Sequence, residues 1–133
     1  MKESFTADSH VWINTKIDIE MKILTGVYKE SGRFPSVQEI TEIYDIGKST
    51  AQKVSTALYE EKILEKQRGI GFFVKENTRK VLYEKHHKIL EKKIKEVVDY
   101  AYKMGIEKNE LKGMIANITN KYDLKGDNRA VWD

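Results

Sequence analysis

Residues 48–53 combine polar and basic side chains in a pattern that suits contact with nucleic acid. Lysine can contact guanine, glutamine can pair with adenine, and serine or threonine can contact phosphate. In the first turns of a helix, such side chains reach base edges in the major groove, and the helix N-terminus itself attracts phosphate. The candidate contacts in this segment are Lys48, Ser49, Thr50, Gln52 and Lys53.

A β-hairpin is expected directly after this helix. Residues 63–67 and 72–74 have the character of two strands around a turn at residues 68–71, which contains two glycines. Lys66 and Arg68 add positive charge to the hairpin. A hairpin with a basic tip can reach the DNA backbone or the minor groove beside a helix in the major groove.

Three helices must position these groups. Apolar residues at helical spacing predict the first helix over about residues 9–25. Ser36 followed by Glu39 forms a capping box that predicts the second helix, and the third helix starts beside Gly47. Two helices, a short turn, a third helix and a hairpin form the order of a winged helix-turn-helix. We therefore expect a mainly α fold with a small β-hairpin, in which residues 1–76 are a winged helix-turn-helix DNA-binding domain.

The remaining residues, 77–133, indicate a helical region. A long charged helix stops at Gly105, and a shorter helix and a polar tail over residues 123–133 follow. The apolar side chains form a stripe too large for a lone helical hairpin to leave in water. Pairing with the same helices of a second chain would bury the stripe, and two-fold symmetry would place two recognition helices on the half-sites of a palindrome. The predicted dimerisation residues are Leu82, Ile89, Leu90, Ile94, Val97, Ala101, Met104, Leu111, Ile115 and Ile118.

The formal net charge of +3 is unevenly distributed. Residues 1–76 carry a net charge of −1, and residues 77–133 carry a net charge of +4. Within residues 48–75, six side chains are basic and three are acidic, so the expected third helix and wing are locally basic. The prediction of DNA binding therefore depends on where the charges lie and not on their sum.

The composition also excludes other classes of protein. The 133 residues include no cysteine, which excludes disulfides, thiolate zinc sites and cysteine nucleophiles. No stretch approaches the roughly 18 apolar residues of a membrane span, and the first residues lack an apolar signal-peptide region, so we expect no membrane partner and a cytoplasmic location.

Glu84 and His87 have the Glu-x-x-His spacing of di-iron bundles without the supporting glutamates. No nucleophile, base and orienting group form a recognisable motif, so we predict no metal, no cofactor and no enzyme activity.

Four short motifs occur in order between about residues 10 and 75. They are Gly26-Val27-Tyr28 with Gly32, Phe34-Pro35-Ser36, Lys48-Ser49-Thr50-Ala51-Gln52, and Gly69-Ile70-Gly71-Phe72-Phe73-Val74. Each motif is weak alone, but in order and spacing they resemble the N-terminal domain of GntR-family transcription regulators.

The resemblance implies DNA contacts from the second helix, the third helix and the wing. The predicted DNA-binding set is Ser36, Gln38, Lys48, Ser49, Thr50, Gln52, Lys53, Arg68 and Gly69. The family commonly has arginines where this chain has Gln38, Lys48 and Gln52. Because arginine and lysine are not equivalent at bidentate contacts, these departures point away from the family's usual operator sequence. Gln52 suggests the hypothesis that adenine is read in place of guanine.

Most GntR relatives carry a larger effector-binding domain, whereas residues 77–133 have room for only two helices. This arrangement resembles the short YtrA-like subgroup, in which the C-terminal helices mainly serve dimerisation. The resemblance implies a homodimeric repressor on double-stranded operator DNA, with a small-molecule effector of unknown identity left open. Two alternatives stay open as well: an activator of the same fold, and a winged-helix protein-interaction module that does not bind DNA.

Overall fold

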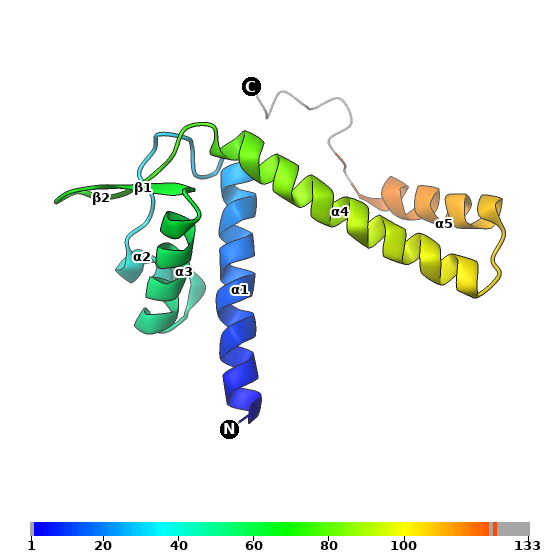
Figure 1. Ribbon diagram of the computed structural model, residues 1–133, viewed down its shortest axis with the longest axis horizontal. Helices are drawn as coiled ribbons and strands as arrows, with labels where there is room; N and C mark the ends of the chain where they lie inside the picture. The colour runs from blue at the N-terminus through cyan, green and yellow to red at the C-terminus, as the bar shows by residue number, and fades with distance from the viewer. Residues whose placement is uncertain (1, 123, 125–133) are drawn as a thin grey trace. The chain divides into compact units, whose positions relative to one another are not determined.

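The computed structural model describes residues 2–122 and Leu124, with side chains from His10 onward. The elements in chain order are α1 (Lys2–Leu24), α2 (Val37–Tyr44), α3 (Lys48–Glu60), β1 (Leu64–Gln67), β2 (Gly71–Val74), α4 (Thr78–Lys103) and α5 (Lys108–Lys121) (Figure 1). This order confirms the predicted mainly α fold with one hairpin. The chain forms two compact units, Met1–Leu82 and Tyr83–Asp133, so the first turn of α4 belongs to the winged unit.

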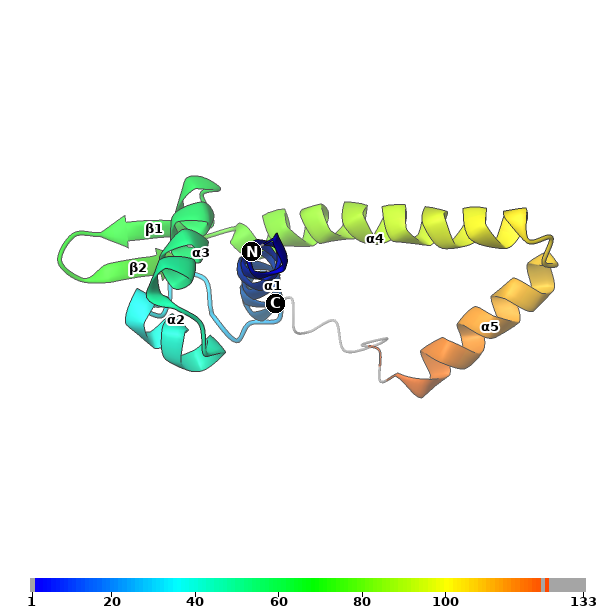
Figure 2. The same cartoon turned by 90° about the horizontal axis from the view of Figure 1, so that it is seen from below.

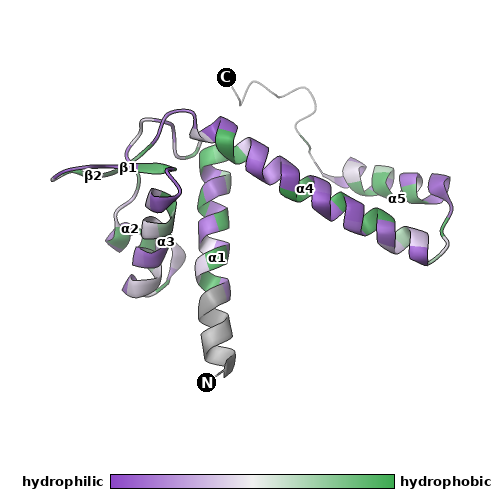
Figure 3. Ribbon diagram, viewed as in Figure 1, coloured by the Kyte–Doolittle hydropathy of each residue, from purple (hydrophilic) through white to green (hydrophobic). Residues whose placement is uncertain are grey.

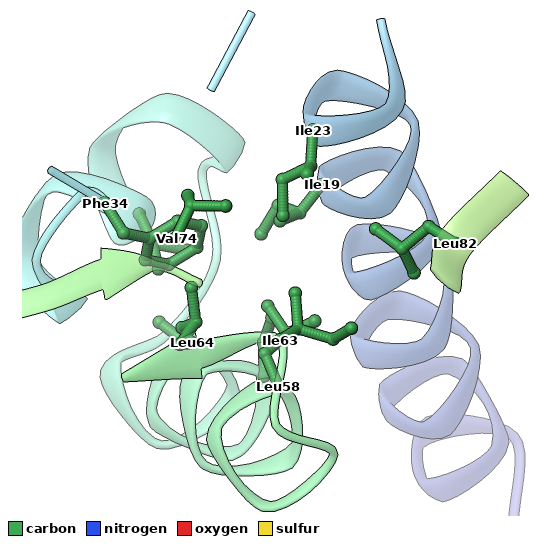
Figure 4. Close-up of a cluster of buried hydrophobic side chains, with 11 residues drawn as sticks. Ile19, Ile23, Phe34, Leu58, Ile63, Leu64, Val74 and Leu82 are labelled. Atoms are coloured by element: carbon green, nitrogen blue, oxygen red, sulfur yellow. The ribbon is translucent and has the colours of Figure 1, made fainter. Parts of the chain in front are cut away.

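The core of the first unit brings together α1, α2, α3 and both strands. Their apolar side chains point into a common interior, with Phe34 entering from the α1–α2 connection (Figure 4). Burial of a large aliphatic or aromatic side chain contributes about 1.5–3 kcal/mol relative to exposure, so this cluster holds α3 against α1. The cluster includes Ile19, Ile23, Phe34, Ile40, Ala51, Val54, Leu58, Ile63, Leu64 and Val74.

Leu82 completes this core from the start of α4, as the fifth residue of that helix. Its side chain is only 1% exposed and belongs to the same cluster of buried residues. The sequence pattern had predicted Leu82 to face a second chain, because its spacing continues the apolar stripe of the long helix. The structure corrects that prediction, since the start of α4 packs within the winged unit.

Local signals explain most of the helix ends in this unit. The predicted capping box at α2 is present: the Ser36 hydroxyl accepts from the Glu39 amide at 3.1 Å, and the Ser36 amide donates to the Glu39 carboxylate at 2.9 Å. Gly47 caps α3 without a side-chain hydrogen bond. Helix α1 is longer than predicted and begins at Lys2.

The two strands form an antiparallel hairpin in which Leu64 lies opposite Val74. The connection between α1 and α2 pairs with the outer edge of this hairpin. The Ser31 amide donates to the Val74 carbonyl at 2.7 Å, and the Phe34 amide donates to the Phe72 carbonyl at 2.9 Å. These bonds brace the base of the wing, while the turn between the strands extends beyond α2 and α3 (Figure 2).

In the second unit, apolar residues recur among hydrophilic ones along α4 and α5 (Figure 3). The predicted stop at Gly105 is confirmed: its φ is 73°, its amide donates to Tyr102, and the Ile106 amide donates to Ala101. These two bonds form a Schellman motif, which ends a helix with a left-handed glycine. Ala101 is only 6% exposed, so, contrary to the prediction, it offers almost no surface to a second chain.

Most of the other predicted dimerisation residues are exposed in the single chain, and Leu111 is half-buried. The exposed members are Ile89, Leu90, Ile94, Val97, Met104, Ile115 and Ile118.

Candidate nucleic-acid interface

The first turns of α3 expose the polar residues that the sequence predicted as DNA contacts. Lys48, Ser49 and Gln52 are exposed, and Thr50 is half-buried. The opposite side of the helix is anchored in the core by Ala51, Val54 and Leu58, which are fully buried. Helix α3 therefore exposes a face that can form hydrogen bonds, and its opposite, apolar face is packed in the core.

Lys53 lies differently from the other candidates. Its ammonium nitrogen is 4.8 Å from the centre of the Trp12 ring on α1. A cation above an indole face is attracted by the ring's negative potential, and such a pair contributes roughly 0.5–1 kcal/mol when exposed. Lys53 therefore links α3 to α1 in the free protein, a contact that sequence spacing did not predict.

The two candidates on α2 form hydrogen bonds within their own helix. The Ser36 hydroxyl serves the capping box, and the Gln38 amide donates to the Glu42 carboxylate at 3.2 Å. The hydrogen bond from the Ser36 backbone amide is the main reason that the pKa of Glu39 lies below its ordinary value. Gln38 is exposed, so a contact between its amide and a base or phosphate would replace its hydrogen bond to Glu42.

A polar cluster holds α2 against α1. The Tyr44 hydroxyl donates to Asp18 at 2.7 Å and accepts from the Lys22 ammonium at 3.0 Å. Lys22 also lies 3.3 Å from the Asp18 carboxylate. Burial, reinforced by the bond to Asp18, raises the pKa of Tyr44 to about 12. The Tyr44 bond in turn lowers the pKa of Asp18 and raises that of Lys22.

A second cluster joins α1 to the end of α3. The Lys16 ammonium lies 3.0 Å from the Glu20 carboxylate and 2.8 Å from the Glu61 carboxylate. Glu20 is fully buried, so its charge needs a close cation. Burial opposes the charge on Lys16, but hydrogen bonds to Glu61 and Glu20 outweigh it, and the pKa of Lys16 is raised.

The wing carries the other predicted contacts, Arg68 and Gly69, in an exposed turn. Gly69 has a φ of 78°, which side-chain-bearing residues rarely adopt. Within the hairpin, the Lys66 ammonium lies 5.9 Å from the ring of Phe72, which is opposite it in register, and this ring stacks at an angle against Tyr59 of α3. The wing is therefore joined to α3 by an aromatic contact.

The predicted site residues thus occupy three neighbouring elements of one compact unit, α2, α3 and the wing. Sequence reasoning missed the side chains that position them, because Trp12, Lys16 and Tyr44 act through contacts with distant parts of the chain. It also missed Ile70, which is 60% exposed at the tip of the wing. An apolar residue between two glycines, in a turn where polar residues are usual, was the available signal.

Two further properties of the described residues bear on the class of protein. In the described part of the chain, no three acidic or histidine side chains come together as a possible metal site. Within the same residues, no helix has the length and apolar character needed to cross a bilayer.

Comparison with known proteins identifies the family. Residues 14–74 match the family model of bacterial regulatory proteins, gntR family. The chain is 30% identical over 103 residues to the HTH-type transcriptional repressor YtrA of Bacillus subtilis (strain 168), an alignment that covers 77% of this chain and 78% of YtrA.

Solved structures show the same fold. A putative GntR-family transcriptional regulator from Bacteroides thetaiotaomicron is 25% identical, with a TM-score of 0.64 and coverage of 84% of this chain and 97% of that one. A GntR-family transcriptional regulator from Listeria monocytogenes is 21% identical, with a TM-score of 0.68 and coverage of 80% and 93%. The chain belongs to the GntR family of bacterial transcription regulators and is similar to YtrA.

Proposed function

We propose that this regulator binds double-stranded DNA in a sequence-specific manner, with the start of α3 in the major groove and the wing on the adjacent backbone or minor groove. The observation that carries the proposal is the exposure of Lys48, Ser49 and Gln52 on a helix whose opposite face is fixed in the core. The basic residues of the wing lie on the element that follows α3. A rigidly held helix with polar side chains in its first turns is the form in which such domains read base edges.

The proposal includes a homodimer formed through the second unit. Seven of the predicted dimerisation residues on α4 and α5 are exposed in the single chain. Exposure of these apolar side chains to water as one surface is unfavourable. Isologous pairing with a second copy of the chain would bury them. A two-fold axis would then present two copies of α3 to an inverted repeat, so the operator would be a palindrome.

Repression is the proposed outcome of binding. YtrA, which is 30% identical over 103 residues, is named a transcriptional repressor. A cytoplasmic dimer that occupies promoter DNA would exclude polymerase without further chemistry, so no cofactor enters the mechanism.

Selection of bound sequences from a random pool of duplex DNA tests the DNA-binding proposal. The expected result is a palindrome that binds in a steeply salt-dependent manner, because each neutralised phosphate releases counterions. Lys48→Ala should weaken binding, whereas Lys29→Ala, which removes an exposed lysine from the α1–α2 connection, should not. Absence of enrichment at any salt concentration would contradict the proposal and favour a protein-interaction module.

Sedimentation of the full chain tests the dimer. Val97→Asp places a charge on an exposed apolar position and should convert the dimer to a monomer with an unchanged helical content. Lys92→Asp makes a larger charge change on the opposite side of α4, as helical spacing places it, and should leave the dimer intact. A wild-type chain that sediments as a monomer at high concentration would contradict the dimer.

A further inference from the structure

The tip of the wing carries one apolar side chain between two glycines. Gly69 has a φ of 78° and Gly71 a φ of 132°, and the Ile70 amide closes the turn on the Gln67 carbonyl at 3.0 Å. Ile70 is 60% exposed and lies outside the core cluster. The turn therefore holds a large apolar group in water, in a position where it does not contribute to the core.

The two glycines also keep this tip narrow. A Cβ atom built on either glycine would meet nothing within 4 Å, so the positive φ values, and not close packing, are the reason for glycine at both positions. A narrow tip matters at a minor groove about 6 Å wide, which a bulkier turn could not enter. Arg68, exposed beside Ile70, supplies the charge that draws such a tip to phosphates.

We propose that Ile70 is a specificity-determining residue that enters the minor groove beside each half-site and selects against G·C base pairs. The proposal rests on the proposed DNA-binding function. In the minor groove, both kinds of base pair present acceptors, and only G·C adds the guanine amino group. Isoleucine has no acceptor, so at a G·C pair this donor would be covered without a partner, which is unfavourable. The preferred operator would therefore have A·T base pairs at the position that the wing contacts.

The test uses the operator selected from the random pool. Each base pair in turn is replaced by guanine·cytosine and by inosine·cytosine, which differ only in the amino group of the minor groove. We expect one position per half-site at which the wild type binds inosine·cytosine about tenfold more tightly than guanine·cytosine, the scale of a typical single-pair penalty. Ile70→Ala should bind the two pairs equally at that position.

Val27→Ala is the matched control, because Val27 is 63% exposed in the α1–α2 connection. It should keep the wild-type profile, and both variants should melt at the wild-type temperature. The same preference for inosine·cytosine in wild type and Ile70→Ala would overturn the assignment, and so would a wild type that binds its operator without distinguishing the two pairs. A wild type that enriches no DNA at all would instead overturn the proposed function itself.

Discussion

The Lys16 ammonium on α1 lies 2.8 Å from the carboxylate of Glu61, the residue that follows the last turn of α3. The same ammonium contacts the buried Glu20 carboxylate at 3.0 Å. One lysine therefore neutralises a buried acid within its own helix and fixes the end of α3. The position of α3 depends on this contact as well as on the apolar core.

Replacement of Lys16 by methionine should strongly destabilise the first unit. It removes the cation beside buried Glu20, and breaking a buried charge pair typically costs about 3–5 kcal/mol. Glu61→Gln, at a partly exposed position, should cost less than about 1 kcal/mol. Urea denaturation measures both values, and equal losses for the two variants would contradict this account.

The same contact should appear in the pH dependence of stability. The pKa of Lys16 is raised above 10.5, so the folded state holds its proton more tightly than the unfolded state. The contribution of the Lys16 charge to the free energy of unfolding is fully present below about pH 10.5. It is lost as the pH rises through the pKa of Lys16 in the folded state. The difference in unfolding free energy between wild type and Lys16→Met should therefore shrink in strong alkali.

Tyr44→Phe tests the cluster that joins α2 to α1. It removes the hydroxyl that donates to Asp18 at 2.7 Å, and a hydrogen bond of this kind contributes about 1 kcal/mol. The pKa of Tyr44 is raised from 10.0 to about 12, so its stabilisation is present below about pH 10 and is lost toward pH 12. Ultraviolet difference titration should show one late tyrosinate transition in the wild type that Tyr44→Phe lacks.

Ser36 variants separate its structural role from its predicted DNA contact. Ser36→Ala removes the cap of α2 and should cost about 1 kcal/mol of unfolding free energy. Ser36→Asp keeps a capping oxygen and should retain stability, while its negative charge should weaken DNA binding. Thermal melting and operator binding measured on both variants check the two roles, and a stable Ser36→Ala protein would contradict the first.

Lys48 and Lys53 should differ in their effect on DNA binding. Both lysines are exposed, but the Lys53 ammonium lies over the Trp12 ring. Lys48→Ala should reduce the slope of log affinity against log salt by about 1, the value for one phosphate contact. Lys53→Ala should change this slope less and lower the melting temperature more, and the reverse order would show that Lys53 leaves Trp12 to bind DNA.

Gln52→Arg should change the base that α3 prefers. Glutamine pairs with adenine in the major groove, whereas arginine pairs with guanine. Binding to operators that differ at one base pair should shift from adenine to guanine at a single position in each half-site. An unchanged preference would mean that Gln52, though exposed, does not read a base.

The sequence by itself determined the elements and their order. The capping box at Ser36, the left-handed glycine at Gly105 and the two-strand pattern around Gly69 are local signals, because each depends on residues a few positions apart. These signals, together with the ordered motifs, were sufficient to predict the winged helix-turn-helix and its family.

Only the tertiary structure decided which side chains act together. Leu82 continues the apolar stripe of α4 in sequence, yet it packs in the winged unit. Lys53 and Gln52 look alike as polar residues of α3, but the packing of α1 places the Trp12 ring beneath the Lys53 ammonium. Ile70 matters because the hairpin carries it clear of the core. Such contacts join residues far apart in the chain, and no local pattern encodes the distance between them.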